Sequence, residues 1–201
     1  MLSAEEIQNG LTGAWRLMTG KADGLRALDL SADGFWNSFF SIAVALPAMI
    51  LGWATSADQW AGDVGGISRA GVVLRLAVRD FGIWLLPLLG FALVARRAGL
   101  GDRFVAYVVA SNWSSVVLAW MSVPIILVSL LPVSDDFVTL LVFLYYGLVF
   151  VLSWRLTNAA IGRGPAVATA VFTGMFIASL VALLALQGVL GLSVPYSTPT
   201  R

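Results

Sequence analysis

The sequence contains no cysteine and no histidine, and charged residues occupy only 11% of its 201 positions. Without these two residue types the chain has no disulfides, no thiolate nucleophile and none of the usual zinc or haem ligands. The lack of histidine also removes the base on which serine hydrolases depend. No glycine-rich loop ends in Lys-Ser or Lys-Thr, so a P-loop for nucleotide phosphates is missing too. These absences predict a protein that is not an enzyme and that holds no metal and no cofactor.

Most of what the sequence does contain is apolar. Hydrophobic residues make up 59% of the chain and the mean hydropathy is +0.90, whereas soluble domains carry roughly 25% charged residues. A soluble chain of this composition would expose large apolar patches. The net charge is only +1, so no overall field attracts nucleic acid. We therefore expect an integral membrane protein whose partners are membrane lipids, with other membrane proteins as further candidates.

Five apolar stretches approach or exceed the roughly 20 residues that a helix needs to cross the hydrocarbon of a bilayer. They cover residues 35–55, 72–95, 104–131, 137–154 and 165–192. Pro47, Pro87 and Pro124 fall inside the first three, where neighbouring helices can satisfy the freed backbone groups. The predicted fold is all-α: a polytopic bundle of about five transmembrane helices, followed by a short external tail at residues 193–201.

Residues 1–34 are expected to lie outside the bilayer. Ser3 and Glu6 have the spacing of a capping box, which opens a helix. Apolar residues then recur at helical spacing, at Ile7, Leu11, Trp15 and Met18. The pattern predicts an amphipathic helix over residues 3–19, followed by a polar connector over 20–34. Two placements stay open: on the membrane surface with the tryptophan inward, or packed on the cytosolic ends of the bundle.

Basic residues are divided unequally between the two sides of the predicted bundle. One side holds eight: Arg16, Lys21, Arg26, Arg96, Arg97, Arg103, Arg155 and Arg163. The other side holds four: Arg69, Arg75, Arg79 and Arg201. Because lysine and arginine accumulate in cytosolic loops, we expect a cytosolic N-terminus and a periplasmic C-terminus. The strong preference for arginine over lysine suggests a GC-rich bacterial genome, and hence the bacterial inner membrane.

The second span carries charged residues into the outer part of the bilayer. Residues 81–95 make only roughly 22 Å of helix, which is too short to cross. A full crossing draws Arg79 and Asp80 below the outer surface and leaves Arg75 at its edge. Charged groups inside a membrane cost about 2.5–3.5 kcal/mol each on insertion scales. The candidate explanations are snorkelling to outer headgroups, structural pairing, and a functional anion or proton site.

The distance of each residue along its helix from the cytosolic edge indicates which side chains could pair with Arg75 and Arg79. Arg75 lies about 30 Å from the cytosolic edge, and Asp136 lies about 28 Å along the fourth span. We therefore expect an ion pair of Arg75 with Asp136, or with its neighbour Asp135, at the outer surface. The same arithmetic puts Arg79 level with Trp120, which predicts a cation–π contact.

The third span carries Asn112, together with Ser111, Ser114 and Ser115, near mid-depth. An amide in hydrocarbon needs a hydrogen-bonding partner, so the first interpretation is a bond between helices. The second interpretation is a polar path for a substrate. Arg79 lies roughly 12 Å from Asn112 along the membrane normal, so the two do not form one compact site.

The fifth span has a small residue at every fourth position. The members of this stripe are Ala166, Ala170, Gly174, Ala178 and Ala182. Such a stripe lets another backbone approach closely. We expect the partner to be a helix of the same chain, with another protein as the alternative.

Two segments in the second half of the chain resemble the Yip-type family of five-span membrane proteins. The first is the polar stretch Val109-Ala110-Ser111-Asn112-Trp113, which leads to Pro124. The second is Ser153-Trp154-Arg155-Leu156, which comes before Pro165. The similarity covers about residues 100–190, and the topology matches over the whole chain. The resemblance implies a cytosolic N-terminal region, five closely spaced spans and a C-terminus on the far side.

The eukaryotic members of that family carry an Asp-Leu-Tyr-Gly-Pro-like cytosolic motif and are tied to small GTPases. Only Asp29-Leu30 and Asp33-Gly34 echo the motif here, without its tyrosine or proline. The resemblance therefore transfers neither a GTPase partner nor any functional residue to this chain.

Two functional hypotheses follow from the sequence. The first is a non-enzymatic helper or subunit in the bacterial inner membrane that acts through lipid or protein contacts. The second is a small transporter or channel with a polar path through the second and third spans. A continuous polar cavity through the bundle would favour transport, whereas tight packing with dry polar contacts would oppose it. A lipid-modifying enzyme would instead need a pocket that gathers Arg79 and Asp80 at the outer leaflet.

Overall fold

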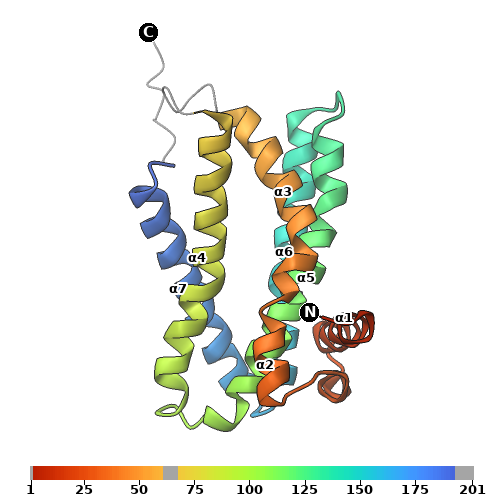
Figure 1. Ribbon diagram of the computed structural model, residues 1–201, viewed down its shortest axis with the longest axis vertical. Coiled ribbons are helices and arrows are strands. Elements are labelled where there is room, and N and C mark those ends of the chain that lie inside the picture. Colours follow the sequence, from red (N-terminus) through yellow and green to blue (C-terminus); the bar gives the residue numbers. More distant parts are fainter. Residues whose placement is uncertain (1, 61–67, 193–201) are drawn as a thin grey trace.

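The computed structural model describes residues 2–60 and 68–192 of the chain. All regular secondary structure within these residues is helical, which confirms the predicted all-α fold. Five helical stretches are long and apolar enough to cross a membrane, and they run side by side along the length of the molecule (Figure 1). The predicted external tail at residues 193–201 lies outside the described residues.

The predicted spans and the observed helices agree closely, with two differences. In chain order the helices are α1 (Ala4–Met18), η1 (Ala22–Ala27), α2 (Ala32–Ser38), α3 (Ser41–Trp60), α4 (Arg69–Ala95), η2 (Gly101–Arg103), α5 (Phe104–Ser129), α6 (Asp135–Ile161) and α7 (Pro165–Val189). The first predicted span is divided into α2 and α3 by a turn at Phe39 and Phe40. The fourth does not end at residue 154, because α6 continues until Gly162 takes up a left-handed conformation with φ of 60°.

Each of the five long helices packs mainly against two others, in the cyclic order α3, α5, α6, α7, α4, with a smaller contact between α4 and α5. The bundle is therefore a ring, in which α4 and α7 face the layer formed by α3, α5 and α6. The loops joining α4 to α5 and α6 to α7 lie at the same end of this ring as α2 (Figure 1). We call this end the α1 end, because α1 also lies near it.

The N-terminal helix begins with the predicted capping box. The Ser3 hydroxyl accepts a hydrogen bond from the Glu6 backbone N–H at 3.1 Å, and Glu6 Oε2 accepts one from the Ser3 N–H at 2.7 Å. These two bonds satisfy backbone donors that the first helical turn would otherwise leave unpaired.

Of the two placements left open for α1, the structure shows packing on the bundle. The helix lies across α5 and α6, roughly perpendicular to the long helices (Figure 1). Its Leu17 and Met18 are fully buried, whereas Trp15 is 47% exposed. A Cβ on Gly10 would come within 2.2 Å of the Trp113 indole ring, so the contact with α5 requires glycine. Small residues make the closest approach to the bundle, and the placement of Trp15 toward the membrane stays a prediction, since its side chain does not pack into the bundle core.

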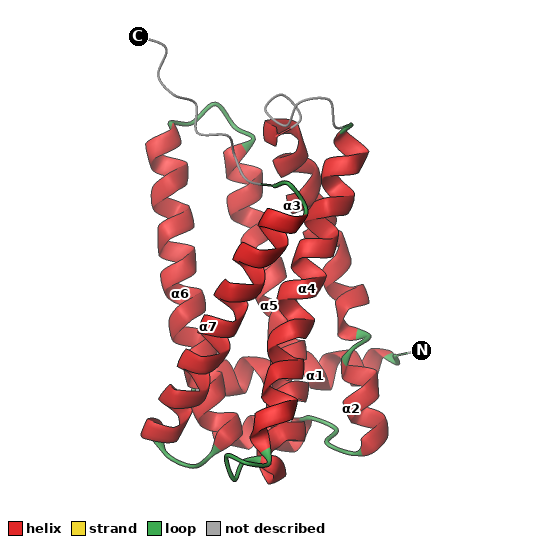
Figure 2. Ribbon diagram, turned by 90° about the vertical axis from the view of Figure 1, so that its left-hand side faces the viewer, coloured by secondary structure: helices red, strands yellow, loops and turns green. Residues whose placement is uncertain are grey.

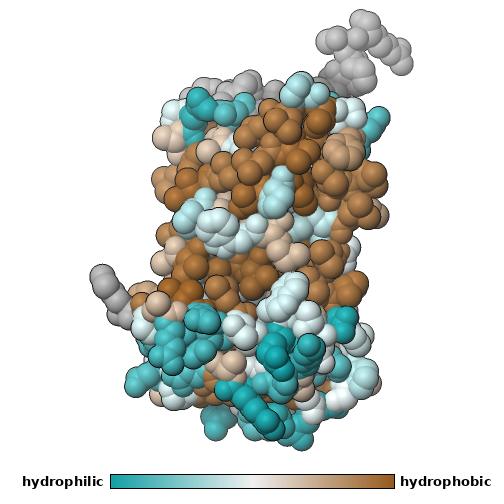
Figure 3. Space-filling model, turned by 90° about the vertical axis from the view of Figure 1, so that its right-hand side faces the viewer, coloured by the Kyte–Doolittle hydropathy of each residue, from teal (hydrophilic) through white to brown (hydrophobic). Residues whose placement is uncertain are grey.

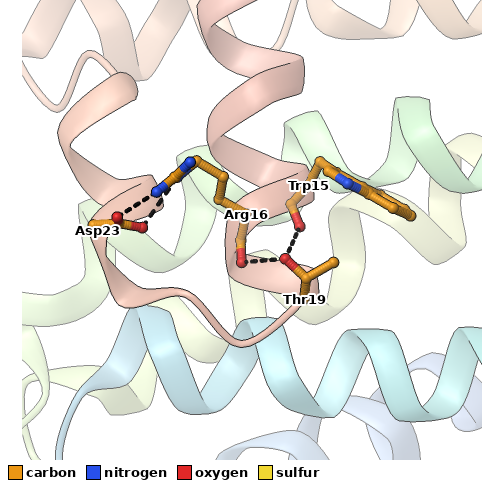
Figure 4. Close-up of polar contacts among 4 residues, drawn as sticks. All are labelled: Trp15, Arg16, Thr19 and Asp23. Atoms are coloured by element: carbon orange, nitrogen blue, oxygen red, sulfur yellow. Dashed lines mark hydrogen bonds and ion pairs between the residues drawn. The ribbon is translucent and has the colours of Figure 1, made fainter.

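An ion pair ties α1 to the following turn of η1 (Figure 4). Arg16 donates from Nε to Asp23 Oδ1 at 3.0 Å, and its Nη2 contacts Asp23 Oδ2. The Thr19 hydroxyl closes the end of the helix by donating to the carbonyls of Trp15 and Arg16. The hydrogen bond from Arg16 lowers the pKa of Asp23 below its ordinary value of 3.8, although desolvation opposes the shift.

Low pH should increase the mobility of the turn after α1, because protonation of Asp23 weakens its ion pair with Arg16. Because the folded state lowers the pKa of Asp23, its stabilising contribution is complete above the ordinary value of 3.8 and is lost as the pH falls through the lower, folded value. A spin label on an Ala27→Cys variant reports the change, since the chain has no native cysteine. We expect broad EPR lines at about pH 6 and sharper lines below about pH 3. With Asp23→Asn added, the EPR lines should be sharp at both pH values. A spectrum of the labelled protein with native Asp23 that does not change with pH would contradict the prediction.

Candidate functional site

A cavity of about 540 Å³ lies inside the ring, and all five long helices contribute to its wall. Its polar lining consists mainly of hydroxyl groups, from Tyr107, Ser111, Ser114, Ser115, Tyr145, Tyr146, Ser153, Thr157 and Ser179. Apolar residues such as Met49, Leu118 and Met175 fill the spaces between them. The cavity is therefore amphipathic, although it lies between helices whose outer surfaces are apolar.

Packed side chains close the cavity toward the α1 end. Leu88, Phe91, Tyr107 and Leu156 are all less than 10% exposed and belong to one buried cluster. The rings of Phe91 and Tyr107 meet edge to face, with their centroids 5.1 Å apart. No open path therefore continues along the axis of the described bundle toward α1.

The cavity opens instead through the side of the bundle. Tyr146 of α6 and Phe176 of α7 line it while being 65% and 51% exposed. Both views show α6 and α7 close together at the α1 end and separated at the opposite end (Figures 1 and 2). The cavity thus reaches the surface beside Tyr146 and Phe176, where exposed side chains such as Phe143 and Ile177 are apolar.

Asn112 joins three parts of the bundle but is not part of the cavity wall. It is fully buried. Its Nδ2 donates to the Ser38 hydroxyl at 2.9 Å, and its Oδ1 accepts from Trp84 Nε1 of α4 at 3.1 Å. Ser41 at the start of α3 donates to the Asn112 carbonyl at 3.2 Å. The residue therefore makes the bonds between helices suggested by the first interpretation, whereas its neighbour Ser111 faces the cavity.

Arg79 and Asp80 of α4 neutralise each other beside the cavity. Arg79 Nε donates to Asp80 Oδ1 at 2.8 Å, and Trp53 Nε1 of α3 donates to Asp80 Oδ2 at 2.8 Å. The side chains of Arg79 and Asp80 are only 20% and 28% exposed. Both carboxylate oxygens are therefore engaged, although Asp80 contributes to the cavity wall.

The partners predicted for the two arginines from depth are not observed. Arg75 Nη1 donates to the Leu190 carbonyl at 2.8 Å, next to the C-terminus of α7, and it forms no ion pair among the described residues. Asp135 and Asp136 lie in the first turn of α6 and are exposed. The predicted pairs do not form because α4 packs on α3 and α7 rather than on α6.

The predicted cation–π contact is also replaced by a different bond. Trp120 donates its indole N–H to the Val44 carbonyl of α3 at 2.9 Å. Arg79 is held by the adjacent Asp80 instead. A carboxylate at hydrogen-bonding distance neutralises a guanidinium more effectively than an aromatic face does.

The small-residue stripe of α7 faces α4, but only its later part is closely packed. Ala182 is buried, and a Cβ on Gly82 of α4 would come within 2.4 Å of Leu186. The first four members of the stripe line an apolar groove of about 740 Å³ between α4 and α7. A Cβ on Gly174 would meet no atom within 4 Å. The helix that faces the stripe is α4 of the same chain. The close approach predicted for the stripe is not observed at its first four members, which leave an open groove.

The cavity wall contains residues that the sequence analysis did not single out. Tyr145, Tyr146, Ser153 and Ser179 come from the fourth and fifth spans, whereas attention to polar residues had concentrated on the second and third. The available signal was the presence of several hydroxyl-bearing residues in each of these two otherwise apolar spans. Within residues 2–60 and 68–192, no cluster of acidic side chains is suited to a metal ion.

The outer surface matches the membrane assignment. Leu93 of α4 and Phe143 of α6 are 78% and 76% exposed. A broad hydrophobic surface lies above the hydrophilic α1 end (Figure 3). Five apolar helices with such a surface define a multi-pass membrane protein, here one with a side-opening internal cavity. No family model, no curated protein and no solved structure matches the chain.

Proposed function

We propose that the protein is a non-enzymatic membrane protein that binds an amphipathic, lipid-like molecule in its central cavity. The observation that carries this proposal is a hydroxyl-lined cavity that opens sideways onto an apolar surface. Its volume of about 540 Å³ falls within the range of roughly 300–1,000 Å³ typical of ligand pockets. The hydroxyls of Ser114, Ser115, Tyr145 and Thr157 donate to backbone carbonyls, but their oxygens can still accept hydrogen bonds. They therefore suit a polar head that donates, while the hydrocarbon part extends through the opening.

The hydrogen bonds of Asp80 indicate which kind of polar head group suits the cavity. Arg79 and Trp53 occupy its two oxygens, so the only carboxylate in the wall presents no free charge. The other polar groups in the wall are neutral. A ligand with an uncharged polar head, such as a hydroxyl or an amide, suits this wall better than an ion does.

We further propose that the α1 end lies in the cytosol of a bacterium and that the bundle spans its inner membrane. The support is the excess of basic residues in the segments at that end. In this orientation the opening between α6 and α7 lies in the outer half of the bilayer. Membership of the Yip-type family stays a prediction, supported by the five apolar helices and the N-terminal helical region.

Transport is the weaker alternative. A substrate path would have to pass the cluster around Phe91, Tyr107 and Leu156, which is buried and packed. A lipid-modifying reaction would need a free acid or base in the cavity, whereas Asp80 is engaged by two partners. The geometry favours binding over passage or reaction.

Filling the mouth of the cavity should abolish ligand retention. Ser179→Phe places a ring where a hydroxyl now lines the wall, so it should displace the bound molecule. Ala185→Phe adds the same ring on the exposed part of α7 outside the wall and serves as the matched control. The protein is extracted into nanodiscs from its native membrane, and native mass spectrometry measures retained molecules. We expect a bound species in wild type and in Ala185→Phe that Ser179→Phe lacks; equal retention in all three proteins, or none in wild type, would overturn the proposal.

A further inference from the structure

A second hollow, of about 570 Å³, lies where the turn after α1 meets α6. We call it the α1–α6 groove. It is lined by the turn residues Gly20 and Ala22 and by one face of α6, which includes Val151, Trp154, Arg155 and Asn158. The positions on α6 follow helical spacing, so the groove runs along the helix rather than across it.

The turn holds one cationic side chain in the groove. Arg155 Nη2 donates to the Thr19 carbonyl at 2.7 Å. Gly20 has a φ of 84°, and a Cβ there would come within 2.8 Å of the same Nη2 atom. The glycine therefore allows the guanidinium to lie against the turn. Because only one of the guanidinium N–H groups is used by this bond, others stay available to a ligand.

The groove has donors but no opposing negative charge. Its lining contains no aspartate or glutamate, and Arg155 forms no ion pair with any described residue. The nearby Asp23 is engaged by Arg16. The Asn158 side-chain amide makes no hydrogen bond to another residue in the described part of the chain, and Lys21 adds a second cation within the turn.

The position of the groove along α6 points to a membrane interface. Trp154 and Arg155 stand where the apolar run of α6 gives way to polar residues, and tryptophan is enriched at this level of membrane proteins. The Trp154 indole is held by a hydrogen bond of 3.0 Å to the Thr169 hydroxyl. From Val151 toward the bundle centre, α6 exposes apolar side chains such as Leu148. A ligand with its anionic group in the groove could therefore lay its apolar part along the exposed apolar face of α6.

We propose that the α1–α6 groove binds the headgroup of an anionic glycerophospholipid. The Arg155 guanidinium and the Asn158 amide bind the phosphate oxygens, because a charge-assisted donor and a neutral donor there face no competing carboxylate. The acyl chains lie along the exposed apolar face of α6. The groove shares no lining residue with the central cavity, so this site is independent of the proposed function.

The test compares lipid preference in nanodiscs that contain equal amounts of phosphatidylglycerol and phosphatidylcholine. Native mass spectrometry measures the ratio of the two lipids retained by the full chain. Arg155→Gln removes the charge, while Asn158→Asp places a carboxylate in the groove without removing the bond between Arg155 and Thr19. Arg97→Gln is the matched control, because Arg97 is exposed and lies outside the groove.

We expect wild type and Arg97→Gln to retain phosphatidylglycerol preferentially, and both groove variants to lower the ratio by about fivefold. Asn158→Asp keeps the test valid if Arg155→Gln detaches the turn. No preference in wild type, or equal ratios in Asn158→Asp and Arg97→Gln, would overturn the proposal. Inorganic phosphate should not displace the lipid; if it does so completely while phosphatidylcholine takes its place, the site binds a free anion and the lipid assignment is wrong.

Discussion

Replacing Asn112 by leucine should lower the free energy of unfolding by about 2 kcal/mol. The amide is fully buried, and leucine would leave the Trp84 indole N–H without its acceptor and the Ser38 hydroxyl without its donor. An unpaired buried donor costs about 1–3 kcal/mol, and hydrogen bonds between membrane helices reach about 1.7 kcal/mol. Because Trp84 has no second partner among the described residues, most of the loss arises there.

Equilibrium unfolding in mixed micelles measures this effect. Ser122→Ala is the control, since the Ser122 hydroxyl bonds only to the Ala119 carbonyl of its own helix; a change below about 0.5 kcal/mol is expected. A double-mutant cycle with Trp84→Phe isolates the coupling between the two side chains. Additive effects in that cycle would show that the Asn112–Trp84 bond contributes nothing to stability.

The second large effect is expected at the ion pair of α4. Asp80→Leu removes the partner of Arg79 and the acceptor of the Trp53 indole. Breaking a fully buried pair costs about 3–5 kcal/mol. The guanidinium here is 20% exposed and can extend toward water, so we expect a smaller loss of about 2 kcal/mol in the free energy of unfolding.

The double variant Arg79→Leu/Asp80→Leu should recover part of this loss. It removes both charges from an apolar environment, and such replacements are often close to neutral. Asp136→Leu is the matched control, because that carboxylate lies exposed in the first turn of α6; its removal should cost less than about 1 kcal/mol. A double variant less stable than Asp80→Leu alone would show that the unpaired charge is not the source of the loss.

Length and composition were sufficient to predict the five spans, because hydrocarbon demands a continuous apolar helix of nearly fixed length. The end of α6 was missed because Arg155 marks the end of an apolar run and not the end of a helix. Backbone hydrogen bonding continues past a charged side chain until Gly162 interrupts it. The interruption at Phe39 and Phe40 was missed because both residues are apolar and read as a continuation of the apolar run of α3.

The candidate site was predictable only in part. Sequence indicated that Asn112 needs partners, but its bonds to Ser38 and Trp84 depend on the rotation of each helix about its axis. Depth arithmetic carries no information on that rotation, which is why Arg75 was assigned to Asp136 rather than to the end of α7. The cavity was missed for the same reason, since its hydroxyl groups come from α5, α6 and α7, which converge only after packing.

The position of α1 has a consequence for synthesis in the cell. This helix is synthesised before the five long helices, but its contacts lie on α5 and α6: Gly10 packs on Trp113, and the Thr19 carbonyl accepts from Arg155 across 136 positions of the chain. Contacts between such distant segments form late, because the intervening chain must be ordered first. The full set of contacts that holds α1 can therefore form only after α6 has been synthesised and placed beside α5.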